Sequence, residues 1–164
     1  MSSPYYSAKA YRARSSIGYL IRRAHNLLMP RVEGAFAEHE VTFTQWVIMM
    51  YLRDGLATTA AGICRDIFHD SGALTRAIDQ LEQRGFIQRR RSTQDRRTVE
   101  LILTPEGAGI VESLIPLVVG CLNRALAGFT HDEIDTLSRL LTKLVAENSP
   151  SSDPARSADL ELTR

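Results

Sequence analysis

The chain has 164 residues, of which 44% are hydrophobic and 24% charged, and it carries a net charge of +1 and two cysteines. These values are ordinary for a globular domain, and they exclude a disulfide scaffold because two cysteines are too few. No run of about 18 apolar residues is present and residues 1–10 lack the apolar segment of a secretory signal, so we expect a cytoplasmic protein without a membrane partner.

The first predicted element is a long amphipathic helix over residues 15–39. Pro30 lies inside it, and proline removes one backbone donor and clashes with the preceding turn. The sequence therefore predicts a kink or a break near Met29. The helical assignment rests on apolar side chains at helical spacing, namely Ile17, Leu20, Ile21, Ala24, Leu27 and Leu28.

A second, shorter helix is expected after residue 42. Thr42 and Gln45 have the spacing of a capping box, and Thr44 is a competing cap. The segment that follows is apolar, and Gly55 is suited to end it. A helix is therefore predicted between one of these caps and Gly55.

Two further short helices complete this region. Thr58 and Thr59 can cap the first of them, and Asp70 or Ser71 the second. The second helix has an inward stripe and is followed by Gly85, where a left-handed C-cap is needed. Its stripe consists of Leu74, Ile78 and Leu81.

The hydrophobic period changes from helix to strand after Gly85. Residues 86–91 and 98–103 are predicted strands, with Val99, Leu101 and Leu103 on one face. Residues 92–97 between them are polar and typical of a turn. Two short strands around such a turn predict a β-hairpin.

Two more helices are expected after the hairpin. Thr104 and Pro105 supply a cap followed by proline at the first helical position, and this helix is predicted to reach about Ala127 with a bend at Pro116. A capping box at residues 130–133 opens the last helix. From residue 148 the Ser, Pro and Asp content predicts a mobile tail. The last helix has a strong apolar stripe: Ile134, Leu137, Leu140, Leu141 and Leu144.

The order of these elements predicts a fold that is mainly α with a small β-hairpin, a winged helix-turn-helix flanked by long dimerisation helices. The outer helices have wider apolar stripes than a small winged helix could cover, so we expect a homodimer. The predicted parts are a basic N-terminal arm (1–14), a dimerisation helix (15–41), a DNA-binding lobe (42–104), C-terminal dimerisation helices (105–147) and the tail (148–164).

Positive charge is concentrated in two zones. Residues 1–31 carry six basic side chains and no acid, and residues 84–97 carry six arginines against Asp95. Such zones are typical of a protein that binds a polyanion, although solvated arginines would give the same pattern.

Three segments resemble the MarR family of winged-helix regulators. Residues 74–87 (LTRAIDQLEQRGFI) are similar to the family's recognition helix and first wing strand. Residues 95–107 (DRRTVELILTPEG) resemble its wing and the turn into its fifth helix, and residues 44–46 (TQW) the start of its second helix. The resemblance implies a transcription regulator, with a repressor expected, that binds a pseudo-palindromic operator on double-stranded DNA as a homodimer.

The resemblance implies a DNA-reading surface on the fourth helix and the wing. The N-terminal part of the helix should enter the major groove, with Ser71, Gly72, Ala73, Thr75 and Arg76. Arg97 should enter the minor groove, and Asp95 can orient its guanidinium, or both residues only staple the hairpin. Further phosphate contacts are expected from Thr58, Thr59, Arg89, Arg90, Arg91 and Arg96.

The resemblance implies an effector, and by the habit of the family a small aromatic or phenolic acid. Cys64 and Cys121 lie on apolar faces typical of inert core cysteines, and Ser15 and Ser16 occupy the place of a peroxide-sensing cysteine. The four histidines are scattered, so no metal site and no cofactor are expected. Candidate pocket residues, which equally fit a core, are Arg22, His25, Met29, Trp46, Met49 and Met50.

Other functions were weighed against DNA binding. No phosphate loop, nucleophile elbow or dinucleotide motif is present, so no catalytic residue and no enzyme are expected. The alternatives are a redox- or metal-responsive regulator of the same fold, and a winged-helix module that contacts protein or RNA.

Overall fold

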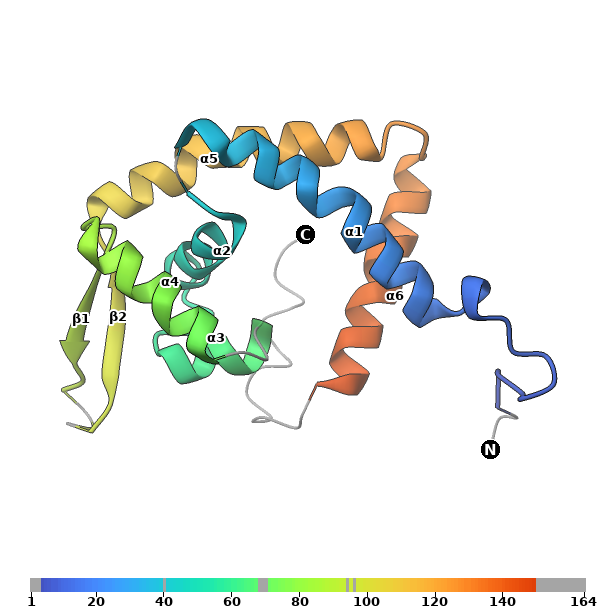
Figure 1. Cartoon of the computed structure of the whole chain (residues 1–164), viewed down its shortest axis with the longest axis horizontal. Helices are drawn as coiled ribbons and strands as arrows, with labels where there is room; N and C mark the ends of the chain where they lie inside the picture. Colours follow the sequence, from blue (N-terminus) through green and yellow to red (C-terminus); the bar gives the residue numbers. More distant parts are fainter. Residues whose placement is uncertain (1–3, 40, 68–70, 94, 96, 150–164) are drawn as a thin grey trace. The chain divides into compact units, whose positions relative to one another are not determined.

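The computed structural model describes residues 4–39, 41–67, 71–93, 95 and 97–149 (Figure 1). A larger unit, Met1–Ala125, and a smaller unit, Leu126–Arg164, make up the chain. The described elements are η1 (Ala13–Ser15), α1 (Ile17–Phe36), η2 (Ala37–His39), α2 (Phe43–Arg53), α3 (Ala60–Ile67), α4 (Ser71–Gln83), β1 (Ile87–Arg91), β2 (Val99–Leu103), α5 (Pro105–Ala125) and α6 (His131–Asn148). The predicted mainly helical fold with a small hairpin is confirmed.

Helix α1 is continuous across Pro30. Of the predicted kink or break near Met29, the break is therefore wrong, and the kink stays a prediction. Ser16 caps the helix by accepting the Tyr19 N–H at 3.4 Å. A proline inside a helix costs about 3 kcal/mol. Val32 and Phe36 follow it and are each 1% exposed, and burying two such side chains contributes about 3–6 kcal/mol. The core packing of the last turns therefore outweighs the lost backbone bond.

Helices α2, α3 and α4 form a lobe with the caps that the sequence predicts. Thr42 and Gln45 make both bonds of the capping box, which excludes the competing cap at Thr44. Thr59 accepts the Gly62 N–H at 3.1 Å and caps α3. Gly55 and Gly85 both adopt the left-handed conformation, with φ of +66° and +74°. Asp70, a candidate cap of α4, lies outside the described residues.

The hairpin extends from the C-terminal end of α4 (Figure 1). Its antiparallel register pairs Ile87 with Leu103 and Arg91 with Val99. Strand β2 is also attached to the loop before α3, because the Leu101 N–H donates to the Thr58 carbonyl at 2.8 Å. The hairpin is thus fixed at its base, between α4 and the α3 loop.

The end of α4, the hairpin and the start of α5 meet at four residues, Gly85, Phe86, Thr104 and Gly107, which we call the joint. The Thr104 hydroxyl lies 2.7 Å from the Gly85 carbonyl oxygen and 3.0 Å from that of Phe86, and it accepts the Gly107 N–H at 3.0 Å. The Thr104 N–H donates to the Phe86 carbonyl at 3.0 Å. The bonds of Thr104 to Gly85 and Phe86 fix the start of α5 to the segment between α4 and β1, and the bond to the Gly107 N–H caps α5.

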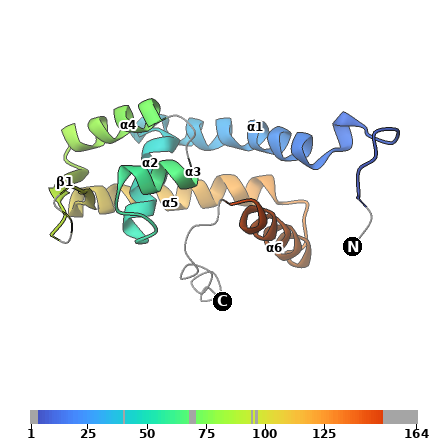
Figure 2. The ribbon, with the colours of Figure 1, turned by 90° about the horizontal axis from the view of Figure 1, so that it is seen from below.

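Helix α5 lies beside α1 in both views (Figures 1 and 2), and the Cys121 thiol lies 3.5 Å from the Arg31 carbonyl oxygen of α1. Arg53 of α2 forms a 3.1 Å ion pair with Glu112. The helix continues across Pro116, where a bend was predicted, and ends at Ala125. By length and composition alone α5 could cross a membrane, but core helices pass the same test, and Val111 and Leu114 are fully buried in the larger unit.

The smaller unit contains α6, which begins at the predicted capping box of Thr130 and Glu133. Four residues of its predicted apolar stripe, Leu137, Leu140, Leu141 and Leu144, are 39–50% exposed, and Ile134 is half-buried. In the larger unit, α1 likewise leaves an apolar stripe exposed, with Ile17, Leu20, Ile21 and Leu27 at 41–53%. The predicted tail lies outside the described residues from residue 150 onward.

Candidate nucleic-acid interface

Helix α4 divides into a buried face and an exposed polar face. Its core face consists of Leu74, Ala77, Ile78 and Leu81. Ser71, Thr75 and Arg76, predicted to read DNA, lie on the exposed face together with Gly72, and Ala73 is half-buried. The Thr75 hydroxyl donates to the Ser71 carbonyl at 2.8 Å, so its lone pairs and methyl group remain to meet a base edge.

An amide pair between a buried Gln45 and an exposed Gln80 anchors α4 to α2. Gln45 is 4% exposed, and its side-chain N–H donates to the Gln80 side-chain oxygen at 2.8 Å. The Gln45 oxygen accepts the Thr42 N–H, so the same amide also closes the cap of α2. This pair fixes α4 relative to the start of α2.

Arg89 of β1 points back onto α4. One of its nitrogens lies 2.6 Å from the Asp79 carboxylate, and another bonds the Glu82 carboxylate. The hydrogen bond to Asp79 is the main cause that raises the pKa of Arg89 above its usual value. Arg89 was predicted to contact phosphate, whereas its charge here is directed to two acids of the chain.

Asp95 holds the turn of the hairpin. One carboxylate oxygen accepts the Arg97 backbone N–H at 2.9 Å and the other accepts the Thr98 hydroxyl at 3.0 Å. Between described side chains, no ion pair joins Asp95 to the Arg97 guanidinium. The Asp95 carboxylate therefore does not orient that guanidinium as predicted. Asp95 staples the hairpin, and Arg97 extends from it exposed to solvent.

The other basic side chains of the hairpin differ in their partners. Arg90 is 64% exposed and lies 3.5 Å from Glu100, whereas Arg91 is exposed and forms no ion pair with the described residues. The Arg84 guanidinium lies 4.7 Å from the centre of the Phe86 ring. Arg96 lies outside the described residues. Arg91 and Arg97 therefore have the charges most available to a phosphate.

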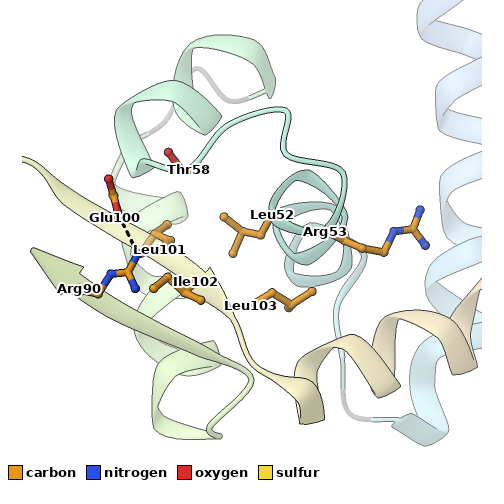
Figure 3. A pocket seen from close by; sticks show the side chains of 8 residues that line it. All are labelled: Leu52, Arg53, Thr58, Arg90, Glu100, Leu101, Ile102 and Leu103. Carbon is orange, nitrogen blue, oxygen red and sulfur yellow. Dashed lines mark hydrogen bonds and ion pairs between the residues drawn. The ribbon is translucent and has the colours of Figure 1, made fainter. Parts of the chain in front are cut away.

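Thr58 and Thr59 lie where β2 meets the start of α3. Thr58 is exposed, while the Thr59 hydroxyl is already engaged as the cap of α3. Their predicted phosphate contact through backbone amides stays a prediction. The same edge lines a hollow of about 410 Å³ between α2 and the hairpin (Figure 3), bordered by Leu52, Arg53, Thr58, Arg90, Glu100, Leu101, Ile102 and Leu103.

None of the six candidate pocket residues lines this hollow. Met49 is fully buried in the core, and Met29 and Met50 are half-buried. Arg22 and His25 are exposed on α1. Trp46 packs against the rings of Phe36 and Phe43, at 5.9 and 5.8 Å between centres, and its buried indole N–H has no partner in the described part of the chain.

A metal site would need a cluster of His, Cys, Asp or Glu side chains. No group of three or more His, Cys, Asp or Glu side chains in the described ranges is placed to hold an ion. Cys64 is half-buried and Cys121 buried, and neither forms a disulfide. The Cys121 sulfur lies 3.3 Å from an Arg124 nitrogen.

The sequence did not predict two contacts that position α4 and the hairpin: the Gln45–Gln80 amide pair and the ion pairs of Arg89 with two acids. Asp79 and Glu82 are three residues apart and therefore share one face of α4. That spacing was available in the sequence, but their partner on β1 depends on how the hairpin folds back.

Comparison with known proteins places this interface in a family. The model of the MarR family matches residues 41–99. Over 107 residues the chain is 34% identical to the multiple antibiotic resistance protein MarR of Salmonella typhimurium, covering 65% of this chain and 74% of that protein. It is 30% identical over 128 residues to the HTH-type transcriptional regulator TtmR of Methylorubrum extorquens, covering 74% of this chain and 64% of TtmR, less than two thirds of that relative.

Solved structures share the fold. A mutant of Escherichia coli MarR complexed with operator DNA matches with a TM-score of 0.69 at 28% identity, covering 78% of this chain and 92% of that one. BpsR of Bordetella bronchiseptica, whose DNA binding is regulated by 6-hydroxynicotinic acid, matches with a TM-score of 0.73 at 25% identity, covering 82% and 96%. The chain belongs to the MarR family of transcription regulators.

Proposed function

We propose that the protein is a repressor that binds a pseudo-palindromic operator as a homodimer, with α4 in the major groove and the hairpin in the minor groove. The observation that carries the proposal is one surface on which the exposed polar face of α4 lies next to an arginine-rich hairpin. Similarity to a MarR structure solved on operator DNA supports it. Thr75 and Arg76 would meet base edges, and Arg97 the minor groove.

The homodimer is proposed from the uncovered apolar stripes. Both α1 and α6 expose rows of large aliphatic side chains to solvent in the single chain. Contiguous exposed apolar surface is typical of an interaction site, and a two-fold dimer would match two half-sites of an operator. The lobe at residues 42–104 would then read DNA, and the helices within 15–41 and 105–147 would pair the two copies.

A small organic acid is proposed as the effector. BpsR, a neighbour at 25% identity, is regulated by 6-hydroxynicotinic acid. In this chain Trp46 offers a buried indole N–H to which no described residue is bonded, and an unpaired buried donor is costly unless something accepts from it. The alternative is a regulator that responds to redox state or to a metal. We also propose that the protein is located in the cytoplasm, at the nucleoid.

The test is selection of bound duplexes from a random DNA library, followed by fluorescence anisotropy on the selected sequence. We expect tight binding of a pseudo-palindrome that unrelated competitor DNA does not displace, at two chains per duplex. Binding that competitor abolishes, or selection of RNA over duplex DNA, would refute the proposal. Aromatic acids are then screened for release of the duplex.

A further inference from the structure

The ion pairs of Arg89 connect the two elements that are proposed to enter the DNA grooves. Arg89 is the third residue of β1, and its guanidinium reaches both Asp79, at 2.6 Å, and Glu82 on the outward face of α4. The side chain is 34% exposed, so the group is partly removed from water. One cation between two carboxylates leaves the cluster with a net negative charge.

We propose that Arg89 is a positioning residue that, with Asp79 and Glu82, clamps the hairpin against α4 so that both elements meet DNA in a fixed orientation. The proposal rests on the proposed DNA-binding function, and it replaces the phosphate contact predicted for Arg89. A cluster with net charge −1 repels a phosphate, whereas an arginine that neutralises phosphates needs an uncompensated charge.

Among the described residues, few contacts hold the hairpin outside the joint: the backbone bond from Leu101 to Thr58 is on the β2 side, and the ion pairs of Arg89 are on the β1 side. A two-stranded hairpin is only marginally stable by itself. Of its ten strand residues only Ile87 and Leu101 are buried; Ile87 is next to the joint, and Leu101 is the middle residue of β2, opposite Arg89. Val99, nearer the turn, is 46% exposed. Arg89 ties β1 to α4 beyond the joint and so opposes rotation of the strands about it.

Neutralising the two acids separates the clamp from the alternative in which Arg89 serves DNA. The variant Asp79→Asn with Glu82→Gln keeps both side-chain shapes and removes two negative charges from each chain. If Arg89 contacts phosphate, this variant frees it and binds DNA more tightly. If Arg89 clamps the hairpin, the variant binds more weakly although the chain has become more positive.

We expect the double variant to lose about three- to tenfold in affinity for the selected duplex, measured by anisotropy at fixed salt. Arg89→Gln should cost a similar factor, and adding it to the double variant should cost nothing further, because the three residues act through one contact. The matched control is Glu100→Gln, which removes an acid on β2 that faces Arg90 at 3.5 Å. It should bind equally well or better.

Hydrogen–deuterium exchange of the DNA-free protein gives a second readout. The double variant should exchange faster than the wild type in residues 86–103, with residues 43–53 unchanged, while Glu100→Gln leaves both segments unchanged. Tighter DNA binding by the double variant, or unchanged exchange in the hairpin, would overturn the clamp. Failure of the wild type to select a duplex would instead refute the proposed function, and the exchange experiment would still decide the clamp.

Discussion

The joint makes one residue of α5 intolerant of any side chain. A Cβ built on Gly107 would lie 2.1 Å from the Phe86 carbonyl oxygen and 2.8 Å from a methyl carbon of Leu103. The Phe86 oxygen would have to retreat by about 1.3 Å to reach an ordinary contact of 3.4 Å. That oxygen is backbone and accepts the Thr104 N–H, so the strand or the helix must move as a whole.

We therefore expect Gly107→Ala to lower the free energy of unfolding by about 3 kcal/mol, the upper part of the range for overpacking. For a chain of this size that corresponds to a Tm lower by roughly 6–12 °C. Urea unfolding followed by circular dichroism at 222 nm measures the loss, at equal protein concentrations because association shifts apparent stability.

Gly109→Ala is the matched control. Gly109 lies two residues further along the same helix, and an added Cβ there meets no atom within 4 Å. Alanine stabilises a helix interior by about 0.5–1 kcal/mol relative to glycine, so this variant should be slightly more stable than the wild type. Equal stability of the two variants would refute the reasoning from close approach at the joint.

Three further predictions concern the joint, the wing and the dimer. Thr104→Val keeps the side-chain shape but leaves the Gly85 carbonyl and the Gly107 N–H without their hydroxyl partner, so it should cost about 1–3 kcal/mol in urea unfolding, whereas Thr142→Val on exposed α6 should cost almost nothing. Arg97→Ala should weaken operator binding about tenfold in an anisotropy titration without changing the dimer, since one inserted arginine is worth about 1–3 kcal/mol; an unchanged affinity would remove Arg97 from the interface. Leu141→Arg should shift the mass measured by light scattering from a dimer toward a single chain of 18.3 kDa. Ala146→Arg, on the opposite face of α6 by helical spacing, should stay dimeric. Equal masses for both variants would contradict the role of the stripe.

The fold was predictable wherever a local rule decides the structure. The capping boxes at Thr42 and Thr130, and the left-handed glycines Gly55 and Gly85, follow from side chains within a few residues of one another. The break at Pro30 was predicted from such a rule and was wrong, because the decisive energy comes from burial of Val32 and Phe36 in a core that a local rule does not contain.

The site was predictable by position but not by partner. The sequence placed an arginine-rich hairpin directly after a helix with an exposed polar face, and the structure has both. The sequence could not predict that Arg89 forms ion pairs with Asp79 and Glu82. Nor could it predict that the Asp95 oxygens accept hydrogen bonds from the Arg97 N–H and the Thr98 hydroxyl. Those partners depend on strand register and turn conformation.

The dependence of DNA binding on salt follows from which arginines of residues 84–97 are free to bind phosphate and which are paired with carboxylates. Two of them, Arg91 and Arg97, are exposed without an ion pair to any described residue, and Arg76 of α4 is also exposed. About three neutralised phosphates per chain, or six per dimer, give a slope of log K against log salt of about −5, and each further contact adds about −0.9. If Arg76 and all six arginines of the zone neutralised phosphates, the slope would be steeper than about −10. Anisotropy titrations from 50 to 200 mM salt distinguish the two values. A slope near the steeper one would mean that Arg89 and Arg90 leave their carboxylates for DNA, which would contradict the clamp.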